Sequence, residues 1–145
     1  MAIGDYVVPR LIEENGGVIV AEMLGEGIRH YADSVATEGD LMNNLASTYY
    51  LKRTPPSQFQ PSWRKRAETV RQMVKDYTID GVILYEMSFE EIHNMEVPII
   101  AKAMEEIKTP FLRLESSYEY SREALGPIAT RIESFIESTK QQRSR

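Results

Sequence analysis

The sequence predicts an α/β domain of three layers, in which a small parallel sheet is flanked by helices, as in half of a flavodoxin-like fold. Short β-branched runs alternate with longer amphipathic segments, and this order is typical of parallel strands joined by crossover helices. The 145 residues are 42% hydrophobic and 27% charged, so one domain can bury a substantial core. We expect a single α/β domain over residues 1–140 and a frayed tail over 141–145.

The first predicted element is a helix. Asp5 is a candidate N-cap, apolar residues recur at helical spacing over 7–12, and Asn15-Gly16-Gly17 is a typical helix stop. The run Val18–Met23 follows directly and is almost entirely apolar, which favours a strand buried on both faces of a parallel sheet. Because an open α/β sheet normally starts on a strand, we expect a first strand of the fold to be missing ahead of this helix.

The middle of the chain predicts helices separated by a loop. Two short helices are expected over 26–52, with Asp40 as the cap of the second. Three prolines within 53–61 are incompatible with a continuing helix, so this stretch is expected to be a loop. An amphipathic helix is then expected over 63–77, starting after Ser62.

The second half of the chain alternates between strands and helices. Residues 81–87 repeat the strand signature, and 89–107 return to a helical period with an expected kink near Pro98. A short strand is expected over 109–115 and a closing helix over 121–140. The sequence thus predicts three strands, counting 18–23, each followed by helical structure.

Charge and composition exclude several classes of protein. Seventeen Lys and Arg against 22 Asp and Glu give a net charge of −5, which repels a nucleic-acid backbone, so we interpret the basic run 64–66 as a solvated helix face. No apolar run approaches the roughly 20 residues of a membrane span, and we expect a cytoplasmic protein. With no cysteine, this chain forms no disulfide and supplies no thiol nucleophile or thiolate ligand.

One candidate ligand-binding edge follows the first predicted strand. It comprises Glu22, Gly25, Gly27 and Arg29. A glycine pair at a strand-to-helix turn allows backbone N–H groups to approach an anion, with Arg29 adding positive charge. Glu26 lies between the glycines and would oppose an anion, so a purely conformational role for the turn is the favoured alternative.

A second candidate group lies just past the strand predicted over 81–87. Glu90, Glu91 and His93 could ligate a metal ion there, because open α/β sheets place ligand crevices at the carboxyl ends of their strands. Acidic residues at a helix start also complement the helix dipole, and we favour this alternative. The catalytic inventory is otherwise thin, since the chain has only two histidines.

Four stretches in order resemble the C-terminal α/β domain of the 2-hydroxyacyl-CoA dehydratase and benzoyl-CoA reductase family. They are residues 11–20 (LIEENGGVIV), 22–29 (EMLGEGIR), 80–83 (DGVI) with Phe89, and 126–135 (GPIATRIESF). The resemblance implies a parallel α/β fold, an acyl-CoA ligand and, in the family, a [4Fe–4S] cluster. It also places Phe89 and Glu90 at the ligand edge of the sheet.

The departures from this family concern the cluster ligands. Gly25 stands where the family usually carries a cysteine, and Phe89-Glu90 stands where it carries Phe-Cys. The loop at 54–57 is likewise free of cysteine. Neither a carboxylate nor a glycine replaces a thiolate in ligating an iron–sulfur cluster, so we expect no cofactor in this chain.

The resemblance and the missing cysteines together imply a cluster-less structural or interaction domain that is not catalytic by itself. From the charge and the apolar pattern we expect no nucleic-acid or membrane partner. We expect a homo-oligomer, because a second copy can cover an exposed sheet edge. The alternative is a subunit or fragment of an acyl-CoA dehydratase or reductase, whose partner chain carries the cysteines and the iron–sulfur cluster.

Overall fold

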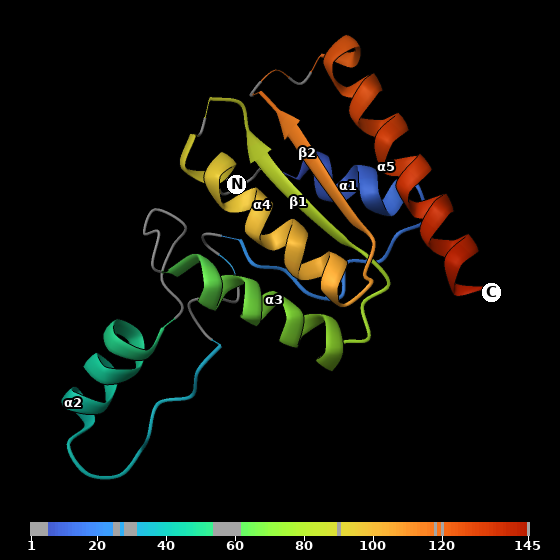
Figure 1. The fold of residues 1–145 in the computed structure, drawn as a ribbon. Helices are drawn as coiled ribbons and strands as arrows, with labels where there is room; N and C mark the ends of the chain where they lie inside the picture. The colour runs from blue at the N-terminus through green and yellow to red at the C-terminus, as the bar shows by residue number, and fades with distance from the viewer. Residues whose placement is uncertain are drawn as a thin grey trace.

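The computed structural model describes residues 6–24, 27, 32–53, 62–89, 91–117, 119 and 121–144, with only the backbone of 92 and 93. They form a mixed α/β fold of helices and a two-stranded parallel sheet (Figure 1). The elements, in order, are α1 (Val7–Glu14), α2 (Leu41–Ala46), the π-helical turn η2 (Ser47–Lys52), α3 (Trp63–Asp76), β1 (Val82–Met87), α4 (Glu91–Glu106), β2 (Phe111–Ser116) and α5 (Arg122–Arg143).

The two strands pair in parallel, with Val82 opposite Phe111 and Met87 opposite Ser116. Because side chains alternate along a strand, Leu114 packs on one face of the sheet and Leu84 on the other. Helices α1 and α5 cover the first face, and α3 and α4 cover the second (Figure 1). The three-layer α/β architecture predicted from the sequence is confirmed.

Each face of the sheet has its own hydrophobic core. On the α1 and α5 side, Leu114 and Ile132 are fully buried within the cluster Val8, Leu114, Ile128, Ile132 and Ile136. On the α3 and α4 side, Met104 is fully buried within the cluster Ala67, Ile100, Ala103 and Met104. Burial of these side chains removes apolar surface from water and holds the helices to the sheet.

Two helix starts predicted from the sequence are confirmed, and at each of them a side chain caps the helix. The Asp40 carboxylate accepts hydrogen bonds from the backbone N–H groups of Met42 and Asn43, at the start of α2. The Ser121 hydroxyl accepts a hydrogen bond from Ala124 N–H at 3.2 Å, at the start of α5. Helix α5 extends to Arg143, beyond the predicted boundary at residue 140.

The strand predicted over Val18–Met23 is wrong. This segment has no regular secondary structure, and Val18 and Val20 leave 82% and 52% of their surface exposed. A β-branched run becomes a strand only where a neighbouring strand accepts its hydrogen bonds, and in the described part of the chain β1 pairs only with β2. The sheet there has two strands rather than the three expected.

Among the described residues of the region 26–52, helical structure is confined to the segment 41–52, which we call the α2–η2 arm. Residues 32–40 are not helical, so the described residues contain no counterpart of the first of the two short helices expected. The predicted cap Asp5 and the loop 54–61 lie outside the described residues. Across the described helices, none is long and apolar enough to cross a lipid bilayer.

The α2–η2 arm stands away from the rest of the fold (Figure 1). Met42, Tyr50 and Leu51 are 74%, 89% and 77% exposed. Apolar side chains of this size are rarely left in water as a group unless they form a contact surface.

Candidate functional site

The carboxyl ends of β1 and β2 lie at the same edge of the sheet, because the strands are parallel. The backbone N–H of Ser88 donates a hydrogen bond to the carbonyl oxygen of Ser116 at 2.6 Å, which joins the turn after β1 to the end of β2. A pocket of about 280 Å³ opens at this edge. It is lined by Ser88, Glu115, Ser116, Ser117, Ala124, Pro127, Ile128 and Arg131. We call it the carboxyl-edge pocket, and its position is where open α/β sheets bind ligands.

Helix α5 supplies one wall of the carboxyl-edge pocket and its cationic group. Arg131 donates from Nη2 to the carbonyl oxygen of Arg113 at 2.6 Å, which positions the guanidinium beside β2. The hydroxyl of Ser116 donates to the carbonyl oxygen of Ser117 at 3.1 Å. Hydroxyl and guanidinium donors suit an anionic or carbonyl oxygen, whereas the Glu115 carboxylate at the same pocket disfavours a highly charged anion.

A buried carboxylate, Glu86, lies behind this edge, on the face covered by α3 and α4, and its partner Arg113 is 41% exposed. Arg113 forms an ion pair with Glu86 and donates a hydrogen bond to Asn94. The Glu86 side chain is 2% exposed, and its Oε2 has no hydrogen-bond partner among the described residues. Buried charges are tolerated only when they are paired, so Arg113 fixes Glu86 in place and ties β1 to β2.

A second ion pair joins α3 to α4. Arg66 Nε lies 2.5 Å from Glu96 Oε1, and the two side chains are 11% and 3% exposed. Solvent screens such a pair weakly. The pair therefore holds two neighbouring helices at a defined position behind the site.

The structure describes two residues of the first predicted ligand edge, Glu22 and Gly27. Glu22 Oε2 accepts a hydrogen bond from Leu24 N–H at 2.5 Å, and a Cβ placed at Gly27 would overlap the Glu22 carboxylate. Gly27 therefore accommodates a close approach of this carboxylate. The structure brings the Glu22 carboxylate close to Gly27, while Gly25 and Arg29 lie outside the described residues. An anion-binding role for this edge stays a prediction.

The second predicted group is also only partly described. Phe89 follows β1 in the turn, has a φ of 72° and is 95% exposed. A bulky residue rarely adopts this left-handed conformation, and strained residues are concentrated at functional sites. Glu91 is exposed in the first turn of α4, where it complements the helix dipole, whereas Glu90 and the His93 side chain lie outside the described residues.

Metal ligation by Glu90, Glu91 and His93 stays a prediction as well. The described side chains contain no grouping of three or more His, Asp or Glu that could hold a metal ion, and two of the three predicted ligands, Glu90 and the His93 side chain, lie outside them.

The sequence interpretation did not identify Ser116, Ser117 or Arg131 as site residues. A polar pair directly after a predicted strand is a signal that could have identified the two serines. Arg131 lies within the 126–135 stretch that carries the family resemblance. Only the packing of α5 beside β2 shows that this arginine reaches the carboxyl-edge pocket.

An iron–sulfur cluster, which the family resemblance implies, does not fit the residues present. Such clusters are held by cysteine thiolates, and none of the 145 residues is a cysteine. The carboxyl-edge pocket instead offers hydroxyl and carboxylate oxygens with one guanidinium. Oxygen donors are hard ligands that suit other ions, so this donor set does not hold a cluster.

Comparisons with known proteins agree on one family. Residues 1–139 match the family described as 2-hydroxyglutaryl-CoA dehydratase, D-component. The chain is 30% identical over 133 residues to "Putative dehydratase subunit YjiM" of Escherichia coli strain K12, which covers 90% of this chain and 33% of that protein. It is 25% identical over 121 residues to the (R)-phenyllactyl-CoA dehydratase beta subunit of Clostridium sporogenes, which covers 80% of this chain and 32% of that protein. The chain thus spans about a third of the length of these two relatives. With nearly its whole length matched, the chain belongs to the 2-hydroxyglutaryl-CoA dehydratase D-component family.

Proposed function

We propose that this chain is a structural or interaction module of the dehydratase family, without redox chemistry of its own. The observation that carries the proposal is the donor set at the carboxyl edge, where the strand ends present hydroxyl, carboxylate and guanidinium groups and no thiolate. These groups bind and orient an oxygen-containing ligand but do not transfer electrons. We propose the cytoplasm as its location.

The partner that we propose for the α2–η2 arm is a second copy of this chain. The exposed side chains of the arm include Tyr49, Tyr50, Met42 and Leu51. Tyrosine and methionine are enriched in protein interfaces. Self-association through one surface on each chain produces a closed dimer with twofold symmetry. Such a dimer would remove the apolar arm from water.

The test combines native mass with iron analysis on the full chain. We expect a dimer at micromolar concentration, a monomer for the double variant Tyr50→Ser/Leu51→Ser, and no iron at cluster stoichiometry in anaerobically purified protein. Tyr77→Ser is the matched control, because Tyr77 is 50% exposed at the end of α3 and outside the arm. A monomeric wild-type chain would refute the proposed interface, and stoichiometric iron would refute the absence of redox chemistry.

A second candidate function is that of a subunit working with a cysteine-bearing partner that holds the iron–sulfur cluster. It is favoured by the names of the two relatives, each described as a subunit of a dehydratase. In this case the carboxyl-edge pocket would contact an acyl-CoA thioester, with Ser116 and Arg131 as oxygen-binding groups. Co-expression with a cysteine-bearing dehydratase subunit should then yield a stable complex. Arg131→Gln should weaken acyl-CoA binding to that complex, and Arg122→Gln, at the exposed start of α5, should not.

A further inference from the structure

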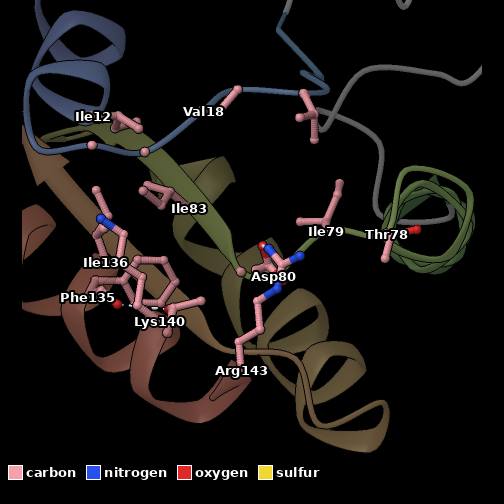
Figure 2. A pocket seen from close by; sticks show the side chains of 15 residues that line it. Ile12, Val18, Thr78, Ile79, Asp80, Ile83, Phe135, Ile136, Lys140 and Arg143 are labelled. Atoms are coloured by element: carbon pink, nitrogen blue, oxygen red, sulfur yellow. Dashed lines mark hydrogen bonds and ion pairs between the residues drawn. The ribbon is translucent and has the colours of Figure 1, made fainter.

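A second and larger pocket lies at the opposite end of the sheet. It has a volume of about 450 Å³ and opens beside the amino end of β1, between the end of α1 and the last turns of α5 (Figure 2). It shares no lining residue with the carboxyl-edge pocket. We call it the amino-edge pocket, and its size falls in the usual range for small-molecule sites, about 300–1,000 Å³.

Most of the lining of the amino-edge pocket is apolar. Ile83 of β1 faces Phe135 and Ile136 of α5, and the remaining apolar wall includes Ile12, Val18 and Val20 (Figure 2). Val18 and Val20 are more than half exposed, so the pocket presents apolar side chains to water in the free chain. An aliphatic chain entering the pocket would cover them, and burial of apolar surface favours binding.

Glycines allow the backbone to approach this apolar wall closely. A Cβ at Gly81 would lie 2.8 Å from Phe135 Cζ, and a Cβ at Gly17 would lie 2.8 Å from Ile12 Cγ2. Real Cβ atoms do not approach that closely, so a larger residue at either position would displace the wall. The pocket is therefore formed by closely packed backbone and side chains rather than by a loose gap.

Among the described residues that line the amino-edge pocket, one positive charge has no ion-pair partner within the described part of the chain. Arg143 pairs with Asp80 at 2.9 Å, and the two residues point toward one another in Figure 2. Lys140 forms no ion pair with any described residue, and its Nζ lies 3.1 Å from the place where a Cβ of Gly16 would be. Gly16, with a φ of 79°, thus leaves room for the ammonium group at the pocket.

We propose that the amino-edge pocket binds a small amphipathic monoanion, an aliphatic carboxylate whose chain lies against Ile83 and Phe135 and whose carboxylate meets Lys140. The single uncompensated charge matches one carboxylate better than a phosphate dianion, and the apolar lining matches a hydrocarbon chain. The site shares no lining residue with the carboxyl-edge pocket.

Octanoate is the probe for this site, in an amide chemical-shift titration of the full chain. Saturable shifts are expected at Ile12, Ile83 and Phe135. Lys140→Gln, which keeps the aliphatic stem, should weaken binding by about two- to fivefold, as expected for an ion pair of an exposed lysine, and octanol should bind wild type less tightly than octanoate by a similar factor. Lys102→Gln is the matched control, because Lys102 is an exposed lysine of α4 outside both pockets.

Three results would overturn the proposal. One is the absence of saturation at millimolar octanoate. Another is equal octanoate affinity in wild type and Lys140→Gln. The third is a set of shifts at the same three residues that follows protein concentration without octanoate, which would assign the groove to a second copy of the chain.

Discussion

The buried Arg66–Glu96 ion pair gives a sharp prediction about stability. Glu96→Gln removes the charge of one partner with little change in shape and leaves the Arg66 guanidinium buried, since this side chain is only 11% exposed. Breaking a buried pair in this way costs about 3–5 kcal/mol, because the remaining charge keeps its desolvation penalty without its compensating partner. Domains of this size have total stabilities of roughly 5–15 kcal/mol, so a loss of about 3 kcal/mol is large and measurable.

Urea denaturation followed by circular dichroism measures this loss as a lower transition midpoint. The matched control is Glu14→Gln, which breaks the Arg10–Glu14 pair, also held through an arginine Nε but with side chains 76% and 53% exposed. Exposed pairs contribute about 0–1 kcal/mol because water screens them, so the control should be nearly neutral. The double variant Arg66→Met/Glu96→Leu should recover much of the loss, since it leaves no unpaired charge.

The reasoning would be refuted if Glu96→Gln and Glu14→Gln changed the free energy of unfolding by the same amount. It would also be refuted if the double variant were less stable than Glu96→Gln alone, because burial of the unpaired guanidinium would then not be the cause of the loss.

Three further substitutions test separate parts of the fold. Asp40→Ala removes the acceptor of two N-cap hydrogen bonds, so amide exchange should accelerate within the α2–η2 arm by a factor corresponding to about 1 kcal/mol, and acceleration elsewhere would argue against an independent arm. Leu114→Ala creates a cavity at a side chain that is fully buried, so the urea midpoint should fall by the equivalent of roughly 3 kcal/mol, and an unchanged midpoint would contradict the core described here. Gly17→Ala places a methyl group 2.8 Å from Ile12 Cγ2 and 3.1 Å from the Ile12 carbonyl oxygen, so about 1–3 kcal/mol should be lost in thermal unfolding, and an unchanged melting temperature would disprove the close approach.

Elements with strong local signals were predicted correctly. The amphipathic period over 63–77 corresponds to α3, and the runs over 81–87 and 109–115 correspond to β1 and β2 within one or two residues at each end. The cap at Asp40 was also predicted, because a cap depends on a side chain and the N–H groups two or three residues away. Information of this kind lies within one turn of helix and needs no knowledge of the rest of the chain.

The error at Val18–Met23 has a different physical origin. Its β-branched residues fit a pleated surface, but a strand also needs hydrogen bonds from a neighbouring strand that is distant in sequence. Along the described chain, β1 pairs with β2, and this segment contributes side chains to the amino-edge pocket instead. Local propensity therefore predicted a strand that tertiary contacts did not support.

Some contacts of the candidate sites follow from nearness in sequence, and others depend on tertiary packing. Glu22 and Gly27 are close in sequence, and the Glu22 carboxylate lies close to Gly27, as their spacing allowed. Arg131 lies at the same pocket as Ser116 and Ser117, at the end of β2, because α5 packs against the sheet through Ile128 and Ile132. No spacing rule along the chain relates these residues, so composition and motif alone did not bring them together.

The sequence by itself determined which chemistry is available to this chain. The absence of cysteine excludes thiolate ligation whatever the fold, and the alternation of strands and helices indicated the α/β layers. Only the tertiary structure decided which donors converge, at the carboxyl-edge pocket near Arg131 and at the amino-edge pocket near Lys140. The physical reason is that the types of ligand atoms are a property of composition, whereas their convergence depends on long-range packing of helices onto a sheet.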